Sequence, residues 1–164
     1  MQKVGGAGGV KDVNKKIFLC SVFGIYCAAL LYIWLFNGRY RLYDMPLSEY
    51  IQRSVNLIPF LTVTNYIKSI GTGTINLKTV FINLAGNIFL FTPLGFLLPA
   101  VFRTLRKFWK SMLTVFFIVL AVEALQLLLQ IGVFDIDDFI LNLLGAALGY
   151  GIWKWKPIQK FINV

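Results

Sequence analysis

The sequence has 164 residues, enough for one domain, and it is 58 % hydrophobic but only 14 % charged. A soluble globular chain is closer to about 45–50 % apolar and about 25 % charged, so this composition argues against a soluble protein and for an integral membrane protein. The formal net charge is +9, but the basic residues gather beside apolar runs without a nucleic-acid-binding motif, which argues against a nucleic-acid partner.

Four apolar runs predict transmembrane helices, because about 20 helical residues cross the hydrocarbon core of a bilayer. We therefore expect an all-α, polytopic membrane protein with four spans, at about 17–36, 81–102, 111–133 and 139–155. The membrane domain is expected over residues 17–155. A basic lead-in (1–16) precedes it, a long loop (37–80) joins the first two spans, and a short tail (156–164) ends the chain.

A shorter apolar segment, VNLIPFLTV at residues 55–63, lies within the long loop. It is too short to span a bilayer, and Pro59 argues against a continuous helix. We expect this segment to lie in the membrane interface or to dip back into the protein.

The charges of the connecting segments predict the orientation of the chain. The lead-in holds four lysines and one aspartate, residues 103–110 hold four basic residues, and the tail from Lys154 holds three lysines. The turn at 135–138 holds three aspartates and no basic residue. Because cytoplasmic loops carry an excess of Lys and Arg, we expect both termini in the cytoplasm and the acidic turn outside. The long loop has five basic and two acidic residues, which opposes this orientation. The opposition is weak, because the charges of long loops influence orientation less than those of short loops.

Polar side chains inside the apolar runs are costly, so their positions carry information about function. At 1.5 Å per helical residue, Glu123 is expected ~15 Å below the outer surface and Gln126 ~10 Å below it. On the same scale Asn87 is expected ~9 Å deep and Asn142 ~6 Å deep. The four side chains are thus predicted to converge in the outer half of the bundle.

A second polar stripe begins at the acidic turn. Asp135, Asp138 and Asn142 share one helical face if a helix starts near the turn. Gly145 and Gly149 form a G-x-x-x-G pattern, which permits two helices to approach closely. The stripe is therefore expected to face the bundle rather than lipid.

Each polar residue also has a structural interpretation. Asp135 or Asp138 could simply cap the helix that follows and have no other role. Asn87 and Asn142 could simply join neighbouring helices by hydrogen bonds. Glu123 could be a protonated or arginine-paired residue that holds the bundle together, with Arg53 as the expected partner.

Four blocks of sequence, in this order, resemble the VanZ-like family. They are RSVNLIPF (53–60), NIFLFTPLGF (87–96), EALQ (123–126) and GVFDIDD (132–138), the last followed by Asn142 and Gly145. The resemblance covers residues 50–150 and implies a small multi-pass protein of the bacterial plasma membrane. It also implies a link to antibiotic resistance, since the family's namesake is associated with resistance to the glycopeptide teicoplanin. The polar pattern of the family falls on Arg53, Asn56, Asn87, Glu123, Gln126, Asp135, Asp138 and Asn142.

We expect these eight residues to form an outward-facing polar and acidic pocket that binds a cell-envelope or lipid-linked ligand. A lipid-linked cell-wall precursor or a glycopeptide would fit such a pocket, in which Arg53 would provide a fork for a phosphate or carboxylate. Membrane lipids are expected partners, a homo-oligomer is left open, and no cofactor is predicted.

An intramembrane enzyme acting on a lipid-linked headgroup is the alternative. Glu123, with its pKa raised by burial, could act as an acid or base, and Asp135 with Asp138 could hold Mg²⁺. The sequence has no histidine and no G-x-S-x-G motif, so no catalytic residue is assigned. An ion-coupled carrier is a weaker alternative, because no ionisable group is expected in the inner half of the bundle.

Overall fold

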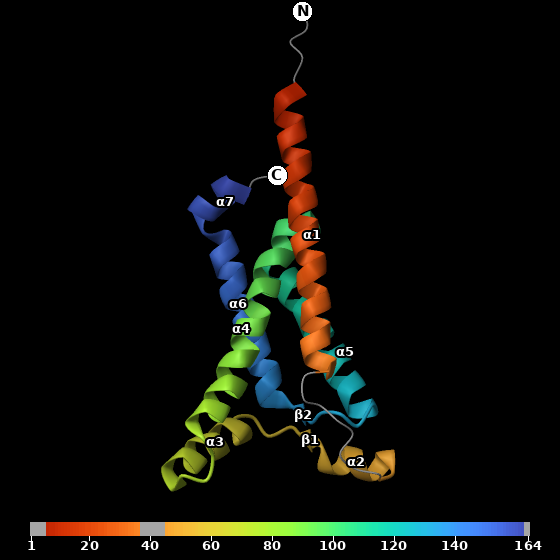
Figure 1. Cartoon of the computed structure of the whole chain (residues 1–164), viewed down its shortest axis with the longest axis vertical. Coiled ribbons are helices and arrows are strands. Elements are labelled where there is room, and N and C mark those ends of the chain that lie inside the picture. The colour runs from red at the N-terminus through yellow and green to blue at the C-terminus, as the bar shows by residue number, and fades with distance from the viewer. Residues whose placement is uncertain (1–5, 37–44, 163–164) are drawn as a thin grey trace, which may run out of the picture.

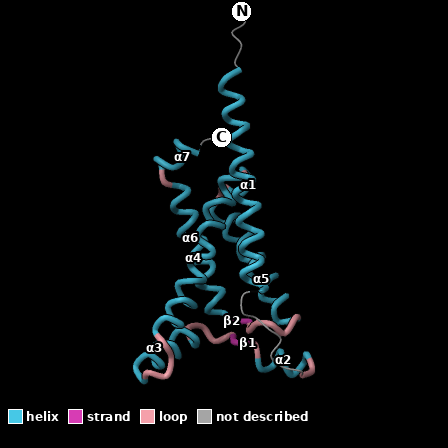
Figure 2. The backbone as a smooth tube through the Cα atoms, viewed as in Figure 1, coloured by secondary structure: helices cyan, strands magenta, loops and turns pink. Residues whose placement is uncertain are grey.

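A computed structural model describes residues 6–36 and 45–162 of the chain, in which long helices form a bundle (Figure 1). The long helices are α1 (Gly6–Phe36), α4 (Leu77–Val101), α5 (Phe108–Leu128) and α6 (Ile136–Lys154). The shorter elements are α2 (Leu47–Arg53), β1 (Val55–Asn56), α3 (Leu61–Thr72), the 3-10 helix η1 (Arg103–Leu105), β2 (Phe134–Asp135) and α7 (Lys156–Ile162). The predicted all-α class is confirmed, with one two-residue strand pair added (Figure 2).

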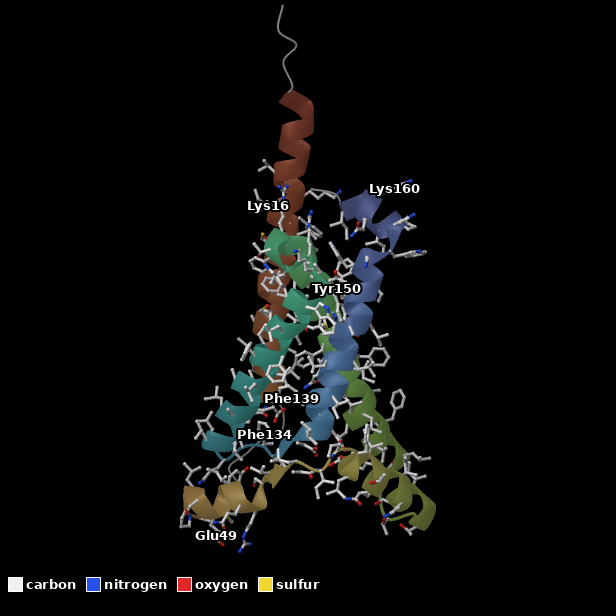
Figure 3. The ribbon with its side chains drawn as sticks, turned by 180° about the vertical axis from the view of Figure 1, so that it is seen from behind. Lys16, Glu49, Phe134, Phe139, Tyr150 and Lys160 are labelled. Carbon is white, nitrogen blue, oxygen red and sulfur yellow. The ribbon has the colours of Figure 1, made fainter. Side chains whose placement is uncertain are left out.

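The bundle has two different ends. The start of α1, the η1 turn and α7 lie at one end, which we call the terminal end (Figure 1). Helices α2 and α3 and the strand pair lie at the other end, where α4 and α5 spread apart (Figures 1 and 3). The side chain of Lys15 joins α1 to α7, because its Nζ donates to the carbonyl of Phe161 and lies 5.3 Å from the centroid of that ring.

Helices α4 and α6 share the largest interface among the described helices. The two helices can approach so closely because glycines lie between them. A Cβ built on Gly149 would clash, lying 1.8 Å from the carbonyl oxygen of Thr92. One built on Gly145 would lie 2.2 Å from the carbonyl oxygen of Ile88, and Gly95 of α4 meets the α6 backbone as closely. The close approach predicted from the G-x-x-x-G pattern is therefore confirmed.

The hydrophobic core lies where α4, α5 and α6 meet, with α1 covering it. The rings of Phe116 and Phe139 pack edge to face across α5 and α6, with centroids 5.0 Å apart. Helix α1 is attached through Leu30 and through Tyr26, whose hydroxyl donates to the Leu90 carbonyl. The buried core residues are Leu30, Phe91, Leu94, Leu98, Val115, Val119, Val122, Phe139 and Ala146.

Several helix boundaries differ from the prediction. Helix α1 begins at Gly6, inside the expected lead-in, and α4 begins at Leu77 because Asn76 caps it by accepting a hydrogen bond from the Lys78 N–H. The third span was expected to reach residue 133, but α5 ends at Leu128 and Gln130 turns the chain with a φ of 57°. The shifts at α4 and α5 follow from capping and turn conformations, which hydrophobicity alone does not reveal.

Three helical segments within the described residues are long and apolar enough to cross a membrane: Val13–Ile33, Leu77–Val101 and Phe108–Leu128. Helix α6 has 19 residues and carries Asp137 and Asp138 in its first turn and Lys154 in its last.

Candidate functional site: a polar recess beside the acidic turn

The connection between α5 and α6 is held by the segment that precedes α3. Strands β1 and β2 pair in parallel, with Val55 opposite Phe134 and Asn56 opposite Asp135. The N–H of Phe134 also donates to the carbonyl of Ser54 at 2.8 Å. The VNLIPFLTV segment thus forms a strand, a turn and the start of α3, and it is not a continuous helix.

Helix α2 is tied to the same connection. The Tyr50 hydroxyl donates to the carbonyl of Gly132 at 2.9 Å, and the Gln130 side-chain amide donates to the carbonyl of Met45 at 3.2 Å. Hydrogen bonds from β1 and from α2 therefore hold the chain in place between α5 and α6.

Asp135 is the N-cap of α6 and also a junction between elements. One of its oxygens accepts hydrogen bonds from the Asp137 N–H at 2.9 Å and from the Asn56 side chain at 3.2 Å. Its other oxygen accepts from the Thr62 hydroxyl. The capping interpretation of Asp135 is therefore confirmed, and Asn56 lies beside it as a direct partner.

Asp137 caps a different helix from the one that carries it. Its side chain is buried, at 2 % exposure, and its two oxygens accept from the backbone N–H groups of Phe60 and, at 3.1 Å, Val63. Helix α3 has no side-chain cap of its own, because Phe60 occupies its N-cap position with a φ of 63°. The carboxylate thus satisfies orphan N–H groups of α3 and complements the positive end of its dipole.

Asp138 joins α6 to α4, since it accepts a hydrogen bond from the side chain of Asn87. Nearby, Asn83 of α4 donates to the hydroxyl of Tyr66 on α3 at 3.1 Å. Burial raises the pKa of Tyr66 above its ordinary value of 10.0, and the negative charge of Asp138 raises it further. The phenol therefore stays protonated at neutral pH and keeps its donor.

These residues line an open recess of about 360 Å³ between α3, α4 and the start of α6. Its volume lies within the ~300–1,000 Å³ range of small-molecule sites. It is lined by Thr62, Tyr66, Asn83, Asn87, Ile131, Gly132, Val133, Asp135 and Asp138. The polar recess is thus built from carboxylates, amides, hydroxyls and a backbone turn.

The structure divides the eight predicted site residues into two groups and one outlier. Asn87, Asp135 and Asp138 line the recess, and Asn56 is bonded to it through Asp135. The second group lies buried on the inward faces of α5 and α6 at 0–2 % exposure and does not line the recess. This second group consists of Glu123, Gln126 and Asn142.

Arg53 is the outlier, and its predicted pairing with Glu123 is wrong. Its guanidinium forms an ion pair with Glu49 at 2.7 Å, four residues earlier on α2. The Arg53 side chain is 68 % exposed, whereas Glu123 is only 2 % exposed. An i,i+4 pair on one short helix forms locally and holds the arginine on the surface.

Asn142 lies one turn beyond Asp138 on α6 and is 1 % exposed. Neither atom of its amide has a hydrogen-bond partner within the described part of the chain. An unsatisfied buried polar group costs about 1–3 kcal/mol. The burial predicted for this stripe is confirmed, but hydrogen-bond glue between helices does not account for Asn142.

The carboxylates beside the recess are few and already have protein partners. Within residues 6–36 and 45–162, no three Cys, Asp or Glu side chains converge on one point. Both oxygens of Asp135 already accept hydrogen bonds from protein donors. A Mg²⁺ ion held by Asp135 and Asp138 would therefore compete with these donors for the oxygens of Asp135.

Residues outside the eight predicted site residues complete the site. Thr62 and Tyr66 come from α3, a helix whose start depends on Asp137 from α6. Asn83 lies one turn from Asn87, so the shared face of α4 was a usable signal. No local pattern identifies Tyr66 as a lining residue.

The apolar helices and the polar recess beside the acidic turn define an α-helical membrane protein. The chain belongs to the VanZ/LLP1 family, whose sequence pattern matches residues 23–157. It is 28 % identical over 151 residues to Protein VanZ of Enterococcus faecium, an alignment that covers 90 % of this chain and 83 % of that protein. No solved structure matches this fold.

Proposed function

We propose that this chain is a four-span protein of the bacterial plasma membrane whose recess binds the polar group of a cell-envelope or lipid-linked ligand. The observation that carries the proposal is the recess itself. It presents the carboxylates of Asp135 and Asp138, amides and hydroxyls on a chain that exposes many large hydrophobic side chains. Polar groups of this kind in a membrane protein mark functional sites by default.

The proposed topology makes α6 the fourth span and the recess its outer mouth. Nineteen helical residues extend ~28 Å, close to the ~30 Å of the hydrocarbon core. The basic residues of the 103–110 segment and of the tail favour the cytoplasm for the terminal end. The acidic turn, at the opposite end in Figure 1, then faces outside.

The lining of the recess favours a ligand that donates hydrogen bonds or carries positive charge. Its lining contains two carboxylates and no basic side chain. Arg53, which was expected to recognise an anion, pairs with Glu49 instead. A lipid amine or a basic glycopeptide matches this chemistry better than a bare phosphate does.

Membership in the VanZ/LLP1 family supports a contribution to resistance against glycopeptides of the teicoplanin type. A recess at the outer surface would engage either the antibiotic or the envelope component that it must reach. The alternative of an enzyme that uses Glu123 with Asp135 and Asp138 finds no supporting observation, because Glu123 does not line the recess.

The substitution Asp138→Asn tests the proposal. It removes a charge-assisted acceptor from the recess, and we expect ligand affinity to fall about 10- to 100-fold, the equivalent of about 1.5–3 kcal/mol. The measurement is binding of phosphatidylethanolamine and of teicoplanin to the purified protein in nanodiscs, together with the teicoplanin tolerance of cells that express it.

The matched control is Glu49→Gln, which removes one carboxylate from the same end but outside the recess. It is expected to retain binding and tolerance. If Asp138→Asn, expressed at normal levels, behaves like this control in both assays, the recess is not the ligand site.

A further inference from the structure

A second cavity, of about 310 Å³, lies at the terminal end of the molecule, between α1 and the junction of α4 with η1. We call it the basic cleft. Three cationic side chains line it, Lys16 from α1 with Arg103 and Arg106 from the connection, and its lining contains no acid. Figure 3 shows Lys16 at this end, far from Phe134 and the acidic turn.

Arg106 is held in place by the protein on both sides. Its Nε donates to the carbonyl of Pro99 at 3.4 Å, and its own carbonyl accepts from the Tyr150 hydroxyl at 2.6 Å. The Pro99 carbonyl belongs to the last turn of α4, where carbonyls lack helical partners. Only one of the five guanidinium N–H donors is used among the described residues, so the others remain for a ligand.

The walls of the basic cleft are apolar. Leu19 of α1 is half-buried, and Phe102 at the end of α4 is 42 % exposed. The ring of Phe102 packs edge to face against Phe23 of α1, with centroids 5.5 Å apart, which fixes the two helices beside each other. A cationic floor between two apolar membrane helices suits a phosphate group that carries hydrocarbon chains.

We propose that the basic cleft binds the phosphate of an anionic phospholipid, with phosphatidylglycerol as the probe. Arg103, Arg106 and Lys16 provide charged hydrogen bonds to the phosphate oxygens. Leu19 and Phe102 contact the start of the acyl chains. Basic pockets between transmembrane helices on the cytoplasmic side bind anionic headgroups in this way. The site rests on the proposed topology, which places the terminal end in the cytoplasm, but it is separate from the recess and does not depend on ligand binding there.

The test uses the full chain, purified into nanodiscs of phosphatidylcholine. Phosphatidylglycerol is titrated in, and its retention is measured by native mass spectrometry alongside the melting temperature. The double variant Lys16→Gln/Arg103→Gln removes two exposed charges without touching the Arg106–Pro99 contact. We expect it to weaken phosphatidylglycerol binding about 25-fold, at about fivefold for each charge.

The matched control is Lys156→Gln/Lys160→Gln, which removes the same charge from exposed positions of α7 outside the basic cleft. It is expected to change binding less than twofold. Equal losses in the two double variants would mean a diffuse surface field and would overturn the site. Equal retention of phosphatidylcholine and phosphatidylglycerol by the unaltered protein would overturn it too.

Glycerol 3-phosphate and inorganic phosphate separate the two sources of the same chemistry. If the lipid is the ligand, neither displaces phosphatidylglycerol at millimolar concentration, because they lack the acyl chains that Leu19 and Phe102 contact. Displacement at micromolar concentration would assign the basic cleft to a soluble phosphate compound and would overturn the lipid proposal.

Discussion

Replacing Gly149 with alanine is expected to destabilise the protein by about 3 kcal/mol, the upper range for overpacking a well-packed contact. The added Cβ would lie 1.8 Å from the Thr92 carbonyl oxygen and 2.9 Å from the Phe96 nitrogen. Both are backbone atoms, so no change of rotamer relieves the clash, and α4 and α6 must separate. The measurement is the free energy of unfolding in detergent, followed by helical circular dichroism.

Gly151→Ala is the matched control for this prediction. Gly151 lies on the same helix two residues later, and a Cβ there meets nothing within 4 Å. Alanine is the better helix former by about 1 kcal/mol, so this variant is expected to be as stable as the unaltered protein or slightly more so. Similar stabilities for the Gly149 and Gly151 variants would contradict the close packing of α4 on α6.

Removing the carboxylate of Asp137 is expected to release α3. In Asp137→Ala the N–H groups of Phe60 and Val63 lose their acceptor, a loss of about 2–4 kcal/mol when the cap and the unsatisfied donors are combined. Asp137→Asn keeps one acceptor oxygen and is expected to lose about half as much. The measurement is hydrogen exchange of the α3 amides, which should become faster than exchange in α4.

Thr64→Ala provides the control for Asp137. The Thr64 hydroxyl is exposed, and it donates to the carbonyls of Phe60 and Leu61 at the start of the same helix. Its removal should leave α3 protected from exchange. The capping role of Asp137 is wrong if its alanine variant protects α3 as well as Thr64→Ala does. Because α3 carries Thr62 and Tyr66, Asp137→Ala should also open the recess.

The sequence predicted the parts of the fold that depend on local composition and periodicity. The four apolar runs correspond to the four long helices. The spacing of Gly145 and Gly149 predicted the close contact of α6 with α4, where these glycines meet the backbone of Ile88 and Thr92. Helix ends were less accurate, because they depend on capping contacts. The start of α6 at Ile136 follows from Asp135, whose side chain turns back to the Asp137 N–H.

The candidate site was predicted in part. Asn87 and Asp138 were expected in the same pocket, and the structure joins them by a hydrogen bond. Glu123 was expected there as well, but its side chain is buried on α5 and does not line the recess, because the packing of α5 is a tertiary property that no local pattern reveals. The i,i+4 spacing of Glu49 and Arg53 was readable in the sequence, and it indicates the local pair that the structure contains.

The strand pair between β1 and β2 sets the order in which the molecule can be completed. Segments that are neighbours in this pair are separated along the chain by two long helices, and the acceptor for the start of α3 is supplied only from α6. Synthesis proceeds from the N-terminus. Asn56, Phe60 and Val63 are therefore made well before Asp135 and Asp137, the residues that accept their hydrogen bonds. A nascent chain that ends after α5 would lack Asp135 and Asp138, so completion of the recess depends on the synthesis of α6.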